Sequence, residues 1–261
     1  MGGPGGQSAG TASYSAVKEI TSDETIKDET YSSENSDENA VLATGSITAQ
    51  LSDTTITKTG DSDGGDTMTA SDLTINTSGR SSAAIRTDRG GGSVDVTVGT
   101  YTTTGIGSPS VYSTADIIVS NAKLVAKASE GIVIEGKNSV TLNDCTLTDS
   151  NTELNGQSTI YKNIFLYQSM SGDAADGNAE FTATDSKITT KKGDTLYVTN
   201  TTATINLENN TIKNTDNEGN FLRAHADSWG NSGSNGGDVT LVMTNQKATG
   251  NIVIDSIRLS I

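Results

Sequence analysis

The chain has 261 residues and a formal net charge of −15, and only 32% of its residues are hydrophobic. An acidic surface of this kind repels nucleic acid and anionic lipid, so neither is an expected partner. No apolar run reaches the length of a membrane span, and therefore no membrane insertion is expected.

The N-terminal region divides into two parts. Residues 1–12 are rich in glycine and are predicted to be a flexible linker, left after removal of a targeting segment. Residues 13–38 contain two strand-like pieces, 14–20 and 25–31, which predict an atypical N-terminal capping coil. Such a cap is expected because the open end of a repeat array exposes unpaired strand edges. A disordered acidic arm is the alternative interpretation of the same residues.

A repeated line of residues follows this region. Ile85, Val111 and Ile132 occupy one place in successive copies, at steps of 26 and 21 residues, and Leu196 and Leu222 occupy it in looser copies. Self-similarity at this spacing is typical of a solenoid, in which each coil buries its apolar side chains against the next. Together with the absence of helical periodicity, it predicts an all-β, right-handed parallel β-helix with three strands per coil, forming a single domain over residues 13–261. The expected strands cover residues 40–44, 46–51, 54–58, 67–70, 72–77, 82–87, 93–98, 100–103, 109–113, 116–119, 123–126, 131–134, 139–142, 146–148, 164–168, 180–184, 187–190, 195–199, 204–207, 211–214, 220–224, 239–243 and 251–255.

A shorter motif, Asp-x-x-Ile/Leu-Thr, begins at Asp53, Asp144 and Asp185, with a variant at Asn209. Asp and Asn side chains hydrogen-bond nearby backbone groups and favour turns, so the motif predicts a corner whose polar residues stack from coil to coil. The chain's single cysteine, Cys145, follows one of these residues and is interpreted as a small buried strand residue.

Long insertions interrupt the pattern at residues 149–163, 170–178 and 226–237. Loops inserted between coils are the usual place for binding determinants on repeat proteins, and passive decoration is the alternative.

Segments 81–92, 108–117, 130–138 and 167–173 together resemble adhesin-like right-handed parallel β-helix repeat surface proteins of anaerobic bacteria. The architecture is similar to that of pectate lyases and of the carbohydrate-binding β-helix proteins of cellulose degraders. The resemblance implies an extracellular or surface-attached protein and supplies no catalytic residues. Residues 58–67 depart from it by being shortened, and the chain stops at residue 261 where relatives continue.

Residues beside the apolar column are candidates for ligand binding. Arg86, Tyr112, Tyr197 and Arg223 each follow a column residue, so they are expected to point outward at strand spacing, about 4.8 Å apart. Stacked rings and guanidinium groups form a platform for a sugar ring or a uronate, which indicates a polysaccharide or a host or cell-surface glycan as partner. The alternative is a set of arginines that only neutralise nearby carboxylates. The full candidate set is Arg86, Asp88, Arg89, Tyr112, Glu135, Lys137, Tyr167, Tyr197, Arg223, His225 and Trp229.

The residues leave other functions open. A polysaccharide lyase would use Arg86, Lys137 or Arg223 as base, with Asp88 and Glu135 holding calcium against the uronate. A glycoside hydrolase would need two close carboxylates on one outward face. A structural spacer is a further alternative. The favoured interpretation is a non-catalytic glycan-binding protein that is a monomer or a weak oligomer, and no catalytic residue is assigned.

Asp61, Asp63 and Asp66 alternate like the ligands of a calcium loop. They depart from the EF-hand pattern, so a polar turn is the alternative. Calcium is the only cofactor that the sequence leaves open.

Overall fold

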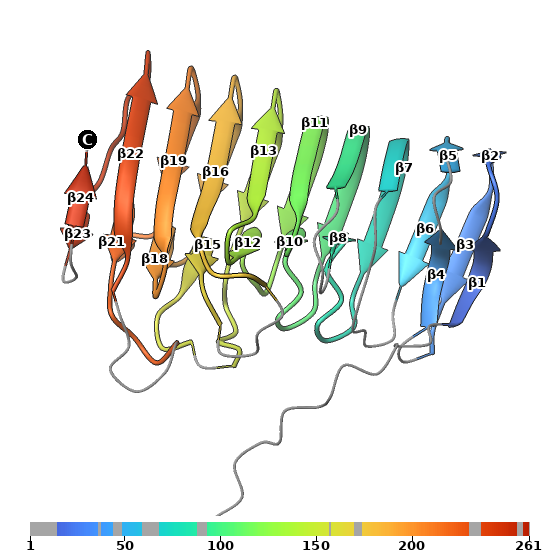
Figure 1. Cartoon of the computed structure of the whole chain (residues 1–261), viewed down its shortest axis with the longest axis horizontal. Helices are drawn as coiled ribbons and strands as arrows, with labels where there is room; N and C mark the ends of the chain where they lie inside the picture. The colour runs from blue at the N-terminus through green and yellow to red at the C-terminus, as the bar shows by residue number, and fades with distance from the viewer. Residues whose placement is uncertain are drawn as a thin grey trace, which may run out of the picture.

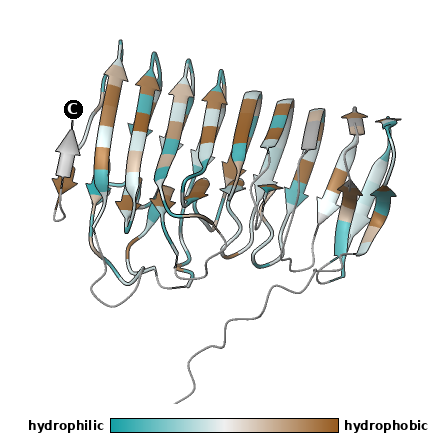
Figure 2. Ribbon diagram, viewed as in Figure 1, coloured by the Kyte–Doolittle hydropathy of each residue, from teal (hydrophilic) through white to brown (hydrophobic). Residues whose placement is uncertain are grey.

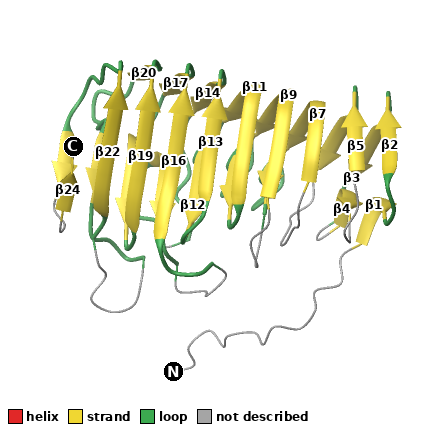
Figure 3. Cartoon of the chain, turned by 45° about the horizontal axis from the view of Figure 1, so that its top comes forward, coloured by secondary structure: helices red, strands yellow, loops and turns green. Residues whose placement is uncertain are grey.

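The computed structural model describes residues 15–35, 38–43, 49–58, 68–87, 93–156, 158–169, 174–229, 236–254 and 258–260. These residues form strands, turns and loops and contain no helix, so the all-β prediction is confirmed for them (Figure 3). It follows that no helix able to cross a membrane occurs in the described ranges.

Most described strands belong to two long sheets (Figure 1). Every pairing between named strands is parallel. In the described residues the seven-stranded sheet has the order β8 (Ile85–Arg86), β10 (Val111–Ser113), β12 (Ile132–Glu135), β15 (Lys162–Tyr167), β18 (Asp194–Thr199), β21 (Leu222–Ala224) and β23 (Ile252–Ile254).

The larger sheet contains β3 (Thr30–Ser33), β6 (Thr55–Lys58), β7 (Met68–Thr77), β9 (Ser93–Thr103), β11 (Asp116–Ala126), β13 (Ser139–Asn143), β16 (Asn178–Thr184), β19 (Thr202–Glu208), β22 (Asp238–Thr244) and β24 (Arg258–Ser260). Three shorter strands pair alongside this row: β14 (Thr146–Asp149), β17 (Lys187–Thr190) and β20 (Thr211–Asn214). From β8 onward the chain passes back and forth between the two sheets, so residues about one repeat apart in sequence become neighbours.

The N-terminal strands pair with the strands that follow them. β1 (Ser15–Ile20) pairs with β4 (Glu38–Ala43), β2 (Glu24–Lys27) with β5 (Ala49–Ser52), and β3 with β6. Residues 15–33 are therefore strand-forming rather than a disordered arm, and their role as a cap stays an interpretation. The predicted linker, residues 1–12, lies outside the described residues.

The predicted apolar column is present. Ile85 pairs with Val111 and Val111 with Ile132. Leu196 pairs with Leu222, and Ile164 fills the place between Ile132 and Leu196. All of these side chains from Ile85 to Leu222 are at most 1% exposed.

A matching column from the larger sheet completes the core. Its buried members are Val94, Ile117, Val140, Phe181, Ile205 and Leu241. The strands of this sheet alternate hydrophobic and hydrophilic residues, with the hydrophobic ones directed into the core (Figure 2). Burial of each aliphatic side chain contributes roughly 1.5–3 kcal/mol to the free energy of unfolding, which makes these columns the main source of stability.

The Asp-x-x-Ile/Leu-Thr motif marks a bend in the larger sheet. β11 pairs with β13 before Asn121 and with β14 after it, so the bend lies at Asn121 and at its neighbour Asp144. The residues at equivalent positions have left-handed backbone angles, with φ between 48° and 58°. Asn and Asp adopt this conformation more readily than other residues with a side chain, so the corner prediction is confirmed. The described members of this corner ladder are Asp28, Asp53, Asp72, Val98, Asn121, Asp144, Asp185, Asn209 and Asn245.

Neighbouring details of the motif agree with this placement. Leu147 and Ile188, three residues after Asp144 and Asp185, are buried, as is Cys145. The expected strand pairs 93–98/100–103 and 116–119/123–126 are each one strand, because hydrogen bonding between strands continues through the bend.

Val98 is the exception in the corner ladder. It is β-branched and has a φ of 58°, so its backbone is strained. Its side chain is 42% exposed, so hydrophobic burial offsets only part of that strain. We expect Val98→Asn to stabilise the protein by roughly 1 kcal/mol, read as a higher urea midpoint.

Ile118→Asn is the matched control for this substitution. Ile118 is also exposed, at 41%, but lies within β11 at an ordinary strand position. The control should leave stability unchanged or lower it, and an equal gain in both variants would contradict the strain argument.

Candidate functional site

The outer side of the seven-stranded sheet carries the predicted second column. Arg86 pairs with Tyr112, Tyr112 with Val133, and Val133 with Phe165. The column continues through Tyr197 to Arg223. Glu135, Tyr167 and Thr199 form a parallel column two residues further along the strands. Arg86 and Tyr112 are therefore neighbours at strand spacing, as are Tyr197 and Arg223, whereas Val133 and Phe165 separate the two tyrosines.

Several members of these columns are buried rather than open. Phe165, Tyr167 and Tyr197 are at most 5% exposed, and the rings of Phe165 and Tyr167 stack with centroids 4.3 Å apart. Trp229 lies edge-on to Tyr167 with a centroid distance of 4.8 Å. We call this group the aromatic cluster; its members are Tyr112, Val133, Ile160, Phe165, Tyr167, Tyr197 and Trp229.

The segments that bury the cluster come from two of the predicted insertions. Ile160 belongs to the segment before β15, and Trp229 belongs to the segment after β21. Tyr112 and Trp229 stay partly exposed. The expected fully open platform is thus replaced by a covered layer with an accessible margin, and a ligand would reach Tyr167 or Tyr197 only if these segments moved.

Glu135 is the polar centre of the cluster. Its side chain is 1% exposed, and it accepts hydrogen bonds from Tyr112 Oη at 2.5 Å, from Tyr167 Oη at 3.1 Å and from the Ser169 hydroxyl. Burial, reinforced by the negative charge of Glu135, raises the pKa of both tyrosines above their ordinary value. The phenols therefore remain protonated and act as donors, which fixes their orientation. The Arg86 guanidinium lies 5.2 Å from the Tyr112 ring centroid, in a cation–π arrangement.

A second polar group lies at the C-terminal side of the cluster. Arg223 Nε is 2.5 Å from Asp194 Oδ2, and Asp194 also accepts hydrogen bonds from Asn220. Tyr197 donates to Asp227 Oδ2 at 2.6 Å. Asp227 Oδ1 in turn accepts the backbone N–H of Trp229 at 2.9 Å. The position of Trp229 is thus tied to the sheet through Asp227 and Tyr197.

Of the remaining predicted site residues, His225 lies next to this group and Lys137 does not. The His225 and Tyr197 ring centroids are 6.3 Å apart. Lys137 is exposed and borders Gly177. Asp61, Asp63, Asp66, Asp88 and Arg89 lie outside the described residues, so calcium binding stays a prediction. Within the described ranges no group of three or more His, Cys, Asp or Glu residues is placed to hold a metal ion.

Lys162 is the main residue that sequence reasoning missed. It is the first residue of β15 and is 0% exposed, with Nζ 4.4 Å from the Phe165 ring centroid and 5.0 Å from that of Tyr197. Burial lowers the pKa of Lys162, and the carboxylates of Glu130, Asp227 and Asp194 only partly oppose this effect. Strand alternation would place Lys162 on the inner side with Ile164. Its position over the outer rings has no signal in the sequence beyond a lysine that lies two residues before an apolar run.

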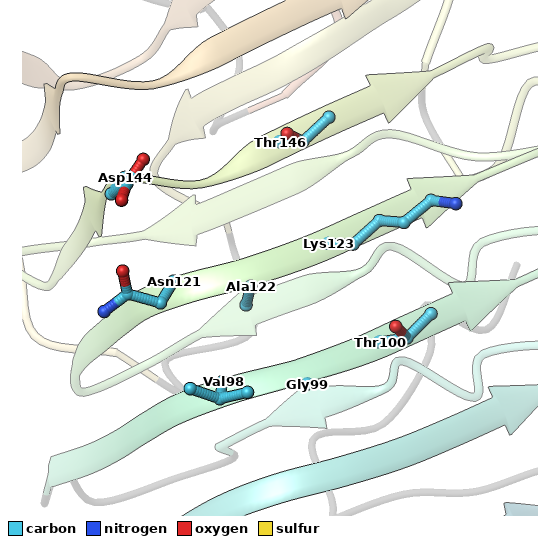
Figure 4. Close-up of a pocket in the computed structure, with 8 residues that line it drawn as sticks. All are labelled: Val98, Gly99, Thr100, Asn121, Ala122, Lys123, Asp144 and Thr146. Carbon is cyan, nitrogen blue, oxygen red and sulfur yellow. The ribbon is translucent and has the colours of Figure 1, made fainter.

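A shallow groove of about 410 Å³ lies elsewhere, along the corner ladder of the larger sheet (Figure 4). Asn121 and Lys123 of β11 line it together with Asp144 of the adjacent bend, and the strained Val98 forms one border. Its lining is mixed polar and apolar and has no ring or paired acid, so the aromatic cluster is the stronger candidate site.

No family model, curated protein or solved structure matches this chain. The resemblance to adhesin-like proteins therefore rests on the sequence segments alone, and the candidate site has to be judged by its own geometry.

Asp149, the last residue of β14, is a buried acid outside the aromatic cluster. It is 0% exposed, and neither carboxyl oxygen has a hydrogen-bond partner among the described residues. Burial raises the pKa of Asp149 to about 8 from its ordinary 3.8, outweighing the nearby Thr190 hydroxyl, which favours the ionised form. In the unfolded chain Asp149 loses its proton near pH 3.8, whereas in the folded chain it keeps the proton up to about pH 8. The stability that this proton confers is therefore complete below pH 3.8 and is lost progressively as the pH rises to about 8.

We expect Asp149→Asn, which keeps the shape of the neutral acid, to match the parent protein at pH 4 and to exceed its stability at pH 7. The difference should be on the order of 4 kcal/mol at pH 7 and should appear in urea unfolding at each pH. Asp95→Asn, at an exposed position, removes the same charge and should show little change with pH. A gain in Asp149→Asn that is the same at both pH values would contradict the assignment.

Proposed function

We propose that the chain is a right-handed parallel β-helix that binds a polysaccharide or cell-surface glycan, as an extracellular adhesin-like protein. The β-helix is supported by the passage of the chain between two parallel sheets and by its in-register apolar columns. The right-handed sense is the one that crossovers between parallel strands adopt in nearly all proteins.

Glycan binding is supported by the concentration of rings and cations on one face of an acidic protein. The chain has only one Trp, seven Tyr and three Phe, yet the aromatic cluster contains Trp229 together with Tyr112, Tyr167, Tyr197 and Phe165. Arg86 and Arg223 flank this cluster along the same column and are partly exposed. Aromatic faces bind the apolar faces of sugars, and guanidinium groups bind carboxylates in two-point contacts.

The extent of burial separates residues that contact the ligand from residues that position them. The partly exposed side chains of Tyr112, Trp229 and Arg223 are the proposed contact residues. Glu135 holds Tyr112 by a hydrogen bond, and Tyr197 holds Trp229 through Asp227. Arg223 is held by its ion pair with Asp194. Rigid positioning of a few contact residues raises affinity because less entropy is lost on binding.

A glycan array that includes uronate polymers tests this proposal. We expect binding to at least one polysaccharide class, and Trp229→Ala should weaken it about fivefold, because one aromatic stack is worth on the order of 1 kcal/mol. Trp229→Phe retains an aromatic face and should keep most of the affinity. Unchanged melting temperatures in both variants would assign the loss to contact rather than to folding.

Other outcomes of the same assay would overturn the proposal. An array with no binding would favour a structural spacer. Release of unsaturated products from polygalacturonate with calcium, lost in Arg86→Ala, would favour a polysaccharide lyase.

A further inference from the structure

Ser158 and Lys162 form a close pair at the edge of the aromatic cluster. Lys162 Nζ lies 2.8 Å from Ser158 Oγ. The serine belongs to the segment before β15 and is partly exposed, whereas the lysine is 0% exposed. A reagent could therefore meet the serine hydroxyl from solvent while the amine stays shielded behind it.

The surroundings of Lys162 can hold a neutral amine. Its nearest groups are the rings of Phe165 and Tyr197 and the carbonyl oxygen of Ile160, which is 3.2 Å from Nζ. None of the described carboxylates forms an ion pair with it. A neutral amine satisfies this geometry by donating one N–H to Ile160 O and accepting the Ser158 hydroxyl proton on its lone pair. Burial favours the neutral form, because it lowers the pKa of Lys162 and outweighs the opposing carboxylates of Glu130, Asp227 and Asp194.

We propose that Ser158 is a nucleophile and Lys162 its general base, forming an acyl-transfer site that acts on carboxylic esters. This inference goes beyond glycan binding and does not depend on it. Ser158 Oγ forms a bond to the ester carbonyl carbon while its proton moves to Lys162 Nζ. The C–O bond to the alcohol then breaks, and Lys162 returns the proton to the departing oxygen. Water then attacks the acyl-serine carbonyl while Lys162 Nζ takes its proton. The bond between the carbonyl carbon and Ser158 Oγ breaks, and Lys162 returns the proton to Ser158 Oγ, which releases the acid.

The neighbours of the pair indicate the kind of ester. Ile160 packs against the aromatic cluster two residues after Ser158. On the other side, Gly156 lies so close to Trp229 that a Cβ atom there would be 3.1 Å from the indole ring. An apolar or aromatic acyl group suits these surroundings better than a charged one.

Labelling of the intact chain with a fluorophosphonate probe, followed by peptide mass spectrometry, tests the assignment. We expect label on Ser158 and none on Ser228, an exposed serine in the segment that carries Trp229. Hydrolysis of p-nitrophenyl acetate should disappear in Ser158→Ala and persist in Ser228→Ala. Lys162→Met should slow labelling by at least about a hundredfold, the usual contribution of a general base.

The pH dependence of labelling separates a base from a structural lysine, and it keeps the test decisive if Lys162→Met fails to fold. The labelling rate of the parent protein should rise with pH and level off below 10.5, the ordinary pKa of lysine. The proposal is overturned by a folded parent protein that does not label at Ser158. A rate that is still rising at the ordinary lysine pKa, or one that is unchanged in folded Lys162→Met, would overturn it equally.

Discussion

Parallel, in-register pairing of strands is the constraint on which the rest of this structure depends. It places each residue directly beside its equivalent in the neighbouring strand, about 4.8 Å away, so any residue type that recurs becomes a column. Ile85, Val111 and Ile132 are buried for this reason, and Asn121 and Asp144 share one backbone conformation for the same reason. Each column favours side chains that suit its backbone conformation and burial, so an unsuitable residue such as Val98 marks a position of backbone strain.

The same constraint decides how charges enter the structure. Like charges in adjacent strands repel, whereas unlike charges stabilise one another. Asp194 of β18 lies beside Lys162 in the strand register, and Arg223 of the next strand supplies its hydrogen-bonded cation. The buried carboxylate of Asp194 is thus compensated by a cation from the adjacent strand. Asp149 has no such partner among the described residues and is neutralised by keeping its proton instead.

The strands could be predicted because their residues repeat along the sequence. The inserted segments do not repeat, so their positions over the sheet could not be predicted. The apolar column could be read because Ile85 and Val111 recur with similar neighbours, and the corner could be read because Asp and Asn favour one conformation. Ile164 was not assigned to the column because the insertion before it obscures the repeat. Burial of Tyr167 and Tyr197 was not predictable either, since alternation gives the side of a sheet that a residue faces but not the segment that folds over it. Lys162 combines both difficulties, because it lies where an insertion joins a strand.

The covering segments are therefore where this regular scaffold becomes specific. Loops carry binding and catalytic residues because they can vary while the sheet beneath them stays rigid. Here the connection between the two is direct: Tyr197 of the sheet holds Asp227, and Asp227 holds the backbone of Trp229. Ser158 is held in a similar way by Lys162, whose amine is fixed over the sheet rings. Two buried residues of the seven-stranded sheet, Tyr197 and Lys162, thus determine where a ring and a hydroxyl are exposed to solvent. Substitution of either residue would alter the site without changing a residue on its surface.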